Sequence, residues 1–257
     1  MQTLIGVWVF IVGACIGSFL NVVIIRGLKN EQIVRGPSHC TTCDYVLKWY
    51  DNIPIISYIM LGGRCRSCHK HISLQYPIVE SITAVTWLLL YIKYGIQVKT
   101  ALYMVACASM IVIAVVDLKI QEIPSTHQLI IFICGVLNLV FKGLPMKEAF
   151  TGFLTVPVFL IIVYIFCLFV LKVEAIGIGD IKLEAVIGLL LGLKLSVTSF
   201  YIGCFLAIII HSILRLIKLP GFDTNRLAFG PYLCGGAYIA MLYGTEIADK
   251  FLMFLSS

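Results

Sequence analysis

The chain has 257 residues, of which 60% are hydrophobic and only 12% are charged, and its mean hydropathy is +1.02. A soluble domain has about 45–50% apolar and about 25% charged residues, so this composition excludes a water-soluble globular protein and predicts an integral membrane protein. Lys and Arg at membrane borders explain the formal net charge of +6, and no basic patch interleaved with aromatic residues indicates a nucleic-acid partner.

Eight apolar runs predict an all-α polytopic membrane protein, with about eight transmembrane helices packed as a bundle in contact with lipid. The first run has no basic segment before it and is too long for a signal peptide, so it predicts a retained anchor. The fourth and sixth runs are shorter than the ~20 residues that a span needs, which predicts tilted or broken helices. The runs are 4–25, 78–94, 101–116, 129–141, 149–171, 183–193, 197–217 and 232–255.

The Lys and Arg residues between these runs predict the orientation of the chain. The loops on one side hold 13 of them and the loops on the other side hold six. Because basic loops stay in the cytosol, the first side is predicted to be cytosolic and both termini to lie outside. Seven of the thirteen are in one loop, so the later loops constrain the orientation weakly.

Residues 26–76 are the only long polar segment, and they contain four of the ten cysteines. Cys40 and Cys43 form one C-x-x-C pair, and Cys65 and Cys68 form a second one 21 residues later. Two such pairs supply four thiolates for one Zn²⁺ in a closed, structural site. The segment is too small to bury a core of its own, so a metal would hold this cytosolic loop domain together.

Two other interpretations of these cysteines stay open. The four could form two disulfides, although thiols on the predicted cytosolic side stay reduced. Three histidines lie beside them and could replace a cysteine as ligand, namely His39, His69 and His71. The six other cysteines fall inside apolar runs, where they are expected to be small buried hydrophobes.

Two aspartates stand at the ends of apolar runs. Asp117 closes the third run, and Pro124 breaks the chain before the fourth. Asp180 follows Gly177 and Gly179, which lack side chains and therefore let backbone or substrate approach the carboxylate. Charged groups at membrane depth are costly and are usually functional. If the two carboxylates face each other they share one proton, so the pair predicts acid–base cleavage of a peptide bond.

Each aspartate also has a simpler structural explanation. Asp117 could be a solvated residue at a helix end or could form a salt bridge with Lys119, and Asp180 could cap the N-terminus of a helix over 181–193. Two glutamates are rival partners: Glu184 lies one turn after Asp180, and Glu80 lies at the start of the second run. Both are more simply explained as polar residues that face the bundle interior or the interface.

Seven motifs in order over roughly 215 residues resemble the type IV prepilin peptidases, which are membrane aspartic proteases that often also N-methylate their product. Besides the two cysteine pairs, the resemblance rests on GSFLNVV at 17–23, WYDNIPIISY at 49–58, YPIVE at 76–80, Asp117-Leu118 with Pro124, GIGDIKL at 177–183 and FGP at 229–231. Three departures are Ser125 after Pro124, Ala228 before the last motif, and Gly27-Leu28 after Arg26. None of them replaces an aspartate or a cysteine.

This resemblance implies a catalytic pair formed by Asp117 and Asp180, with Gly177, Gly179 and Lys182 as supporting residues of the second motif. It implies an enzyme of the bacterial cytoplasmic (inner) membrane that cuts the short basic leader of prepilins or pseudopilins after a glycine, at the cytosolic border. The new N-terminus would be methylated from S-adenosylmethionine, whose binding residues the sequence does not identify. The division expected is an anchor at 1–25, a zinc-binding loop at 26–76 and a peptidase core at 77–257.

Two alternative functions stay open. The chain could be a peptidase without methyltransferase activity. It could also be a non-enzymatic, zinc-bearing membrane scaffold or transporter that uses its intramembrane carboxylates as a proton relay.

Overall fold

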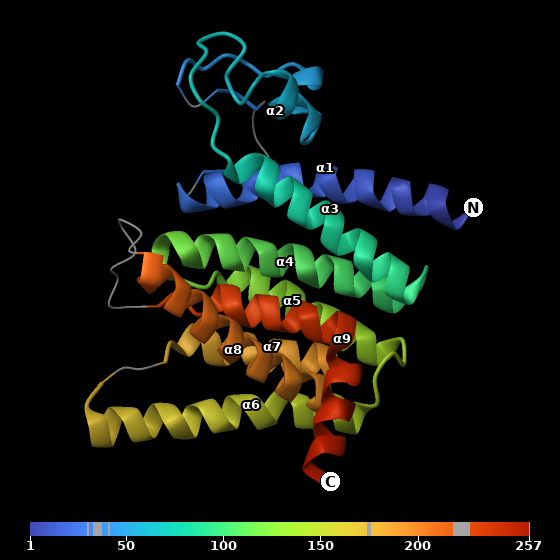
Figure 1. The fold of residues 1–257 in the computed structure, drawn as a ribbon, viewed down its shortest axis with the longest axis vertical. Coiled ribbons are helices and arrows are strands. Elements are labelled where there is room, and N and C mark those ends of the chain that lie inside the picture. The colour runs from blue at the N-terminus through green and yellow to red at the C-terminus, as the bar shows by residue number, and fades with distance from the viewer. Residues whose placement is uncertain (30, 33–37, 41, 174–175, 218–226, 257) are drawn as a thin grey trace. The chain divides into compact units, whose positions relative to one another are not determined.

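The computed structural model describes residues 1–257 apart from 30, 33–37, 41, 174–175, 218–226 and 257. The described residues are mostly α-helical, with two isolated β-bridges and no strand among them, which confirms the predicted all-helical fold (Figure 1). Each of the eight predicted apolar runs coincides with a helix. The chain divides into two compact units, Met1–Ile96 and Gln97–Ser257.

Several helices have the length and apolarity that crossing a membrane requires. Among the described residues there are four, Gln2–Leu28, Val98–Ile120, Met146–Leu171 and Leu193–Leu214, and Ser125–Val140 is a shorter apolar helix. The protein is therefore a multi-pass membrane protein. The functional division into anchor, metal-binding loop and peptidase core stays a prediction.

The first unit is built on two packed helices, α1 (Gln2–Leu28) and α3 (Gln75–Tyr94). Glycines on α1 allow the close approach: a Cβ on Gly17 would lie 2.6 Å from the Cα of Glu80. Small residues at such contacts let membrane helices gain dispersion energy from backbone contact. The Asn21 side chain adds a polar link, since its Nδ2 donates to the Tyr76 carbonyl at 3.2 Å.

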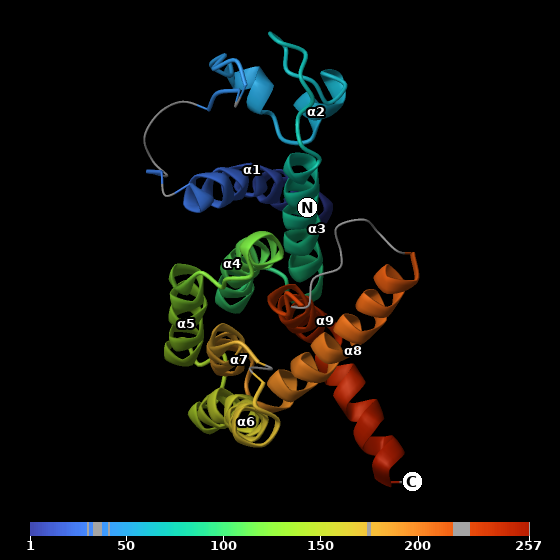
Figure 2. The same cartoon turned by 90° about the vertical axis from the view of Figure 1, so that its left-hand side faces the viewer.

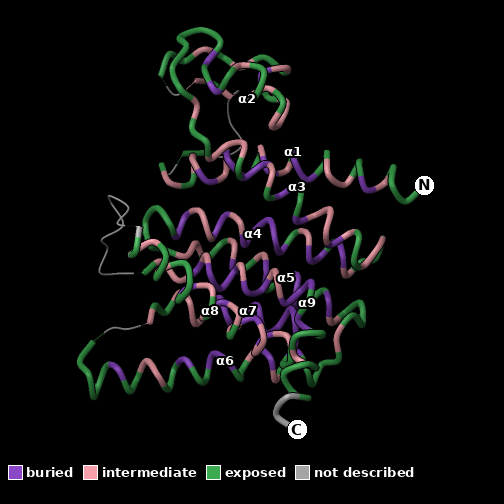
Figure 3. Tube along the Cα trace, in the orientation of Figure 1, coloured by how far each residue is buried: buried purple, intermediate pink, exposed green. Residues whose placement is uncertain are grey.

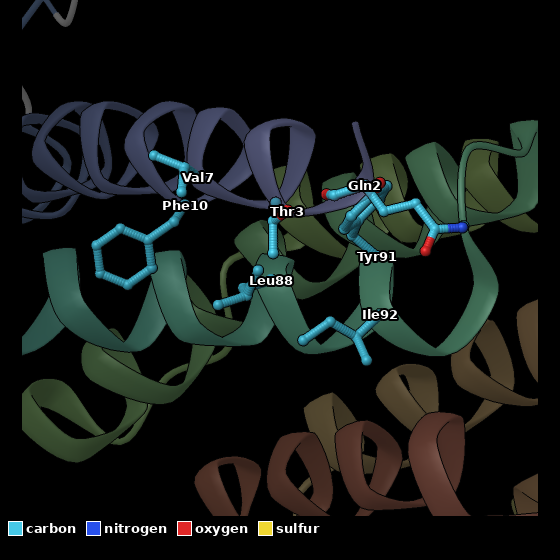
Figure 4. Close-up of a pocket in the computed structure, with 9 residues that line it drawn as sticks. Gln2, Thr3, Val7, Phe10, Leu88, Tyr91 and Ile92 are labelled. Carbon is cyan, nitrogen blue, oxygen red and sulfur yellow. Dashed lines mark hydrogen bonds between the residues drawn. The ribbon is translucent and has the colours of Figure 1, made fainter.

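A groove of ≈ 520 Å³ lies between the first turns of α1 and the last turns of α3 (Figure 4). Its walls are mainly apolar, as expected of a surface that faces lipid. At its polar edge the Tyr91 hydroxyl donates to the Gln2 carbonyl at 3.3 Å. The groove is lined by Gln2, Thr3, Gly6, Val7, Phe10, Leu88, Tyr91, Ile92 and Gly95.

The polar loop between α1 and α3 contains only short helical segments, η1 (Trp49–Asn52) and α2 (Ile56–Met60). Asp51 is its buried anchor: the Arg66 Nε donates to its carboxylate at 2.8 Å, and the Lys48 backbone N–H donates at 3.3 Å. The hydrogen bond that Arg66 donates to Asp51 raises the pKa of Arg66 above its usual value. With so little apolar core, the loop depends on such polar links and on its cysteines.

The second unit is a bundle of six α-helices among the described residues of 97–257. They are α4 (Val98–Ile120), α5 (Ser125–Val140), α6 (Met146–Phe166, continued by the π-helical turn η2, Cys167–Leu171), α7 (Ile178–Leu191), α8 (Leu193–Ile217) and α9 (Gly230–Ser256). The chain can be followed in Figure 2, where α7 lies between α5, α6 and α8.

The short helix α7 occupies the centre of this bundle. It contacts α5, α6, α8 and α9, and most of its residues from Leu183 to Leu191 are buried. A Cβ on Gly188 would overlap with the Gly152 carbonyl, so two glycines bring α7 and α6 into backbone contact. Gly192, with φ +82°, then ends α7 in a conformation that suits glycine. Because its neighbours enclose it, the second half of α7 (185–191) is apolar on all sides.

Candidate active site

Asp117 lies in the last turn of α4 and is almost fully buried, with 5% of its surface exposed. Its carboxylate accepts a hydrogen bond from the Gly230 N–H at 2.9 Å, at the first residue of α9. The N-terminal N–H groups of a helix favour a negative charge. The two simpler explanations of Asp117 are therefore wrong, since its side chain is not exposed to solvent and its hydrogen bond is to Gly230 and not to Lys119.

Residue 230 has to be glycine because a larger side chain would collide with the Asp117 carboxylate. A Cβ there would lie 2.8 Å from the Asp117 Oδ2, closer than non-bonded atoms normally approach. The FGP motif therefore has a physical reason to carry glycine in its centre. The sequence suggested the motif but not its contact with Asp117.

Asp180 lies in the first turn of α7, where its simpler explanation as the capping residue is wrong. The N-cap is Gly177, and the Asp180 N–H donates to the Gly177 carbonyl at 3.1 Å. The helix therefore covers Ile178–Leu191 instead of the predicted 181–193. A Cβ on Gly177 would lie 2.9 Å from the Asp180 Oδ2, so the absent side chain leaves room for the carboxylate.

The segments that carry the two aspartates are joined through the start of α5. The Gln128 Nε2 donates to the Gly179 carbonyl at 2.8 Å, and a Cβ on Gly179 would touch the Ile123 Cβ at 3.3 Å. Ile123 follows Asp117 by six residues and Gly179 directly precedes Asp180, so the segments that carry the two aspartates lie against each other. Sequence reasoning missed Gln128, a buried polar residue one turn after Pro124.

The two rival carboxylates have different surroundings. Glu184 is fully buried on α7, and neither of its carboxyl oxygens has a hydrogen-bond partner among the described residues. An ionised carboxylate without partners is very unfavourable in such a place, so we infer that Glu184 carries its proton. Glu80 belongs to the first unit, where it accepts a hydrogen bond from the Ile55 N–H at 2.8 Å. Lys182 is exposed on α7.

The loop of the first unit brings the four predicted cysteines together as two similar turns. The N–H after each pair, from Asp44 and from His69, donates to the carbonyl of the first cysteine at 3.0 Å. Asp44 and His69 both adopt positive φ, at 52° and 57°. Each pair is thereby presented by a tight turn of the same construction.

The four Sγ atoms all lie within 4.8 Å of one another, and the Cys40–Cys68 and Cys43–Cys65 pairs are 3.9 Å apart. Sulfurs at about 2.3 Å from a tetrahedral zinc are about 3.8 Å apart, whereas a disulfide joins them at about 2.05 Å. The four cysteines are free, so the disulfide alternative is wrong. Against the effect of burial, the N–H groups of Thr42 and Cys43 lower the pKa of Cys40 to about 7.

These features define a class of protein: a multi-pass helical membrane protein with buried carboxylates on α4 and α7, and with a tetracysteine cluster that could hold a metal ion. Residues 11–94 match the Bacterial Peptidase A24 N-terminal domain, and residues 104–212 match the Type IV leader peptidase family. The chain belongs to the type IV leader peptidase family.

Curated relatives agree with this assignment. A prepilin leader peptidase/N-methyltransferase of Myxococcus xanthus is 33% identical over 72% of this chain and 56% of its own length. One of the same name in Bacillus subtilis is 29% identical over 95% of this chain and 96% of the relative. A relative named type 4 prepilin-like proteins leader peptide-processing enzyme, from Escherichia coli, is 31% identical over 90% of this chain and 91% of its own length. No solved structure matches the chain.

Proposed function

We propose that the chain is a membrane aspartic peptidase that removes the short basic leader of type IV prepilins or pseudopilins, with Asp117 and Asp180 as its catalytic pair. The observation that carries this proposal is the buried position of Asp117 in the unit that also holds Asp180, where Gly179 packs against Ile123 and accepts a hydrogen bond from Gln128. Family membership supplies the class of substrate. The supporting roles of Gly177, Gly179 and Lys182 belong to the same proposal.

The chemistry follows from two carboxyl groups that share one proton. The ionised group takes a proton from a water molecule, whose oxygen attacks the scissile carbonyl carbon. The protonated group donates a hydrogen bond to the carbonyl oxygen, on which negative charge develops. When the C–N bond breaks, the proton taken from water passes to the leaving amine, and the pair returns to its singly protonated state.

The position of the pair suits a substrate with a soluble leader and a membrane-bound helix. Asp117 ends an apolar helix that is long enough to cross the membrane, so the cut would occur at the membrane border. The distribution of Lys and Arg favours the cytosolic border of the inner membrane. We place cleavage after the glycine at the end of the leader on this side.

We further propose that the chain methylates the new N-terminus of the cleaved pilin. The names of the relatives support this second activity. S-adenosylmethionine would supply an electrophilic methyl group to the free amine. The residues that bind this donor are not identified.

The four cysteines fit Zn²⁺ in number, ligand type and sulfur separation. All four tetrahedral positions would be filled by sulfur, so the ion would stabilise the loop without activating a water. Cys40, Cys43, Cys65 and Cys68 would hold it, and the loop would lose its shape without it.

The decisive experiment replaces each aspartate by its uncharged isostere. With the full chain in vesicles and a prepilin as substrate, Asp117→Asn and Asp180→Asn should each slow cleavage by roughly 10²–10⁴-fold. Glu122→Gln is the matched control, because Glu122 is exposed five residues after Asp117 and undergoes the same chemical change. Normal cleavage by either aspartate variant would contradict the proposed pair.

Methylation needs a separate assay. Labelled S-adenosylmethionine and a pilin that has already been cleaved should give a labelled N-terminus with the unmodified chain. If no label is transferred, the chain is a peptidase only.

A further inference from the structure

The loop of the first unit exposes a group of large apolar side chains that no role proposed above uses. Trp49, Ile56, Ile59 and Met60 have 79%, 55%, 71% and 81% of their surfaces exposed. Ile56, Ile59 and Met60 lie on one face of α2, at spacings of three and four residues. Trp49 belongs to η1, which packs against α2. Figure 3 shows that much of this loop is exposed. We call these four residues the α2 surface.

A hydrogen bond ties the start of the α2 surface to α3. Ile55, the residue directly before α2, donates its N–H to the Glu80 carboxylate on α3 at 2.8 Å. Ile55 has φ +64°, which is unusual for a β-branched residue, so the surrounding contacts impose this turn. The start of α2 therefore cannot move freely away from the first turns of α3.

The first turns of α3 lie beside one end of a spanning helix. Asn21, near the end of α1, contacts the side chain of Gln75 and the carbonyl of Tyr76 at 3.2 Å. Since α1 is long and apolar enough to cross the membrane, these contacts place the start of α3 near a membrane border. Leu74 and Ile78 at this end are also exposed and apolar, as expected where a helix meets lipid.

The groups next to the α2 surface are aromatic and basic. Trp49 packs edge-on against Tyr50, and the Arg66 guanidinium lies over the Tyr50 ring at 5.1 Å, with the Lys48 ammonium at 5.8 Å. Residues 26–76 carry seven Lys or Arg residues and three Asp or Glu residues. Tryptophan and basic side chains are enriched where proteins meet lipid headgroups, and the positive excess complements anionic lipids.

We propose that Trp49, Ile56, Ile59 and Met60 insert into the boundary between the headgroups and the acyl chains of the membrane that α1 spans. The tetracysteine loop then lies on the membrane surface, with its apolar side chains out of water. Burial of such a patch is favourable, whereas a patch this apolar on a soluble module would promote aggregation.

The three tryptophans of the chain, Trp8, Trp49 and Trp87, allow a direct test. In the full chain, Trp8→Phe with Trp87→Phe leaves Trp49 as the only indole. The protein is placed in vesicles of phosphatidylcholine and phosphatidylglycerol that carry nitroxide quenchers at the headgroup or deep in the acyl chain, with iodide as the aqueous quencher. Headgroup nitroxide should quench Trp49 at least about twofold more strongly than the deep label does.

The matched control keeps Trp8 alone through Trp49→Phe and Trp87→Phe. Trp8 is 61% exposed on the spanning helix α1, so it should be quenched from within the lipid and not by iodide. If iodide quenches Trp49 and lipid labels do not, the surface faces water. If neither quencher reaches Trp49, another protein surface covers it. Either result would overturn the proposal.

A second variant tests the role of α2 itself. Ile59→Asp with Met60→Asp, in the background that keeps Trp49, places two charges on the face that is proposed to insert. Quenching of Trp49 should then shift from the headgroup label toward iodide. Unchanged lipid quenching in this variant would show that the α2 face does not hold the loop on the membrane.

Discussion

At the scale of single residues, the geometry around Asp117 makes Gly230 a sensitive position. Gly230→Ala places a Cβ 2.8 Å from the Asp117 Oδ2 and 3.2 Å from its Cγ, so the carboxylate must move. A displacement of about 1 Å in a catalytic group can lower activity by about 10²-fold, and we expect a loss of that order in kcat/KM for prepilin cleavage.

The same helix offers a matched control for this change. A Cβ on Gly235 would meet its nearest neighbour, Leu206 Cδ1, at 3.4 Å, which is close to ordinary contact. Gly235→Ala should therefore cleave prepilin nearly normally. Equal activities for the two variants would show that Gly230 does not position Asp117.

Gln128 is the other residue whose change should be informative. Gln128→Leu removes the hydrogen bond to the Gly179 carbonyl, so the start of α7 loses its tie to α5. Loss of such a bond lowers the free energy of unfolding by about 1 kcal/mol, and we expect slower cleavage as well, because Asp180 directly follows Gly179. Thermal unfolding and kcat/KM are the measurements. The exposed Gln97 supplies the control Gln97→Leu, which should alter neither.

The residues of the site differ in how far the sequence could predict them. Local signals in the sequence indicate the four cysteines by their spacing and the two aspartates by a charge at the end of an apolar run. The four cysteines do come together, whereas the catalytic roles of the aspartates stay a prediction. Gln128 and Gly230 could not be assigned a contact, because their partners are distant in sequence, at Gly179 and Asp117.

At the scale of elements, the tetracysteine loop should depend on its metal. Cys65 is the most buried of the four cysteines, with 4% of its surface exposed. Cys65→Ser should lower the zinc content of the purified chain from about one per chain to near zero and make the loop open to proteases, because binding a structural zinc contributes on the order of 10 kcal/mol to folding.

Cys15 supplies the control for this prediction, since it is an exposed cysteine on α1, outside the cluster. Cys15→Ser should retain the metal and the protease resistance of the loop. A chelator should reproduce the effect of Cys65→Ser in the unmodified chain. Full metal content in the Cys65 variant would show that the cluster is not the zinc site.

Helix positions followed from the apolar runs, but the ends of the central helix did not. The prediction of 181–193 assumed that Asp180 caps the helix, because aspartate is a good N-cap. In the structure the turn begins three residues earlier at Gly177, and Gly192 ends the helix with a positive φ. The sequence contains both glycines, but it does not show which backbone conformation each adopts.

At the scale of the whole molecule, the composition predicts a multi-pass membrane protein. Fewer observations support the predicted count of about eight spans. In the part of the chain that the structure describes, four helices have the length and apolarity to cross by themselves. The second half of α7 is apolar and is enclosed by other helices of the bundle, and in a sequence this pattern resembles that of a span. Short apolar helices must therefore be tested by experiment.

The helix α5 is the most informative one to test, because epitopes at its two ends show whether it crosses the membrane and on which side Asp117 lies. Its 16 residues are about 24 Å long, shorter than the ~30 Å core of a bilayer, so its ends lie close to both borders only if α5 crosses. The predicted orientation puts the Asp117 end of α4 in the cytosol and the turn after α5 outside.

A short epitope inserted after Glu122 in the full chain should then bind antibody only in lysed spheroplasts. An epitope inserted after Lys142 should bind antibody in intact spheroplasts as well. Prepilin cleavage by both insertion variants would show that the fold is retained. Exposure of the Glu122 epitope in intact spheroplasts would reverse the orientation and move the proposed cleavage site to the outer face. Exposure of neither epitope in intact spheroplasts would mean that α5 does not cross.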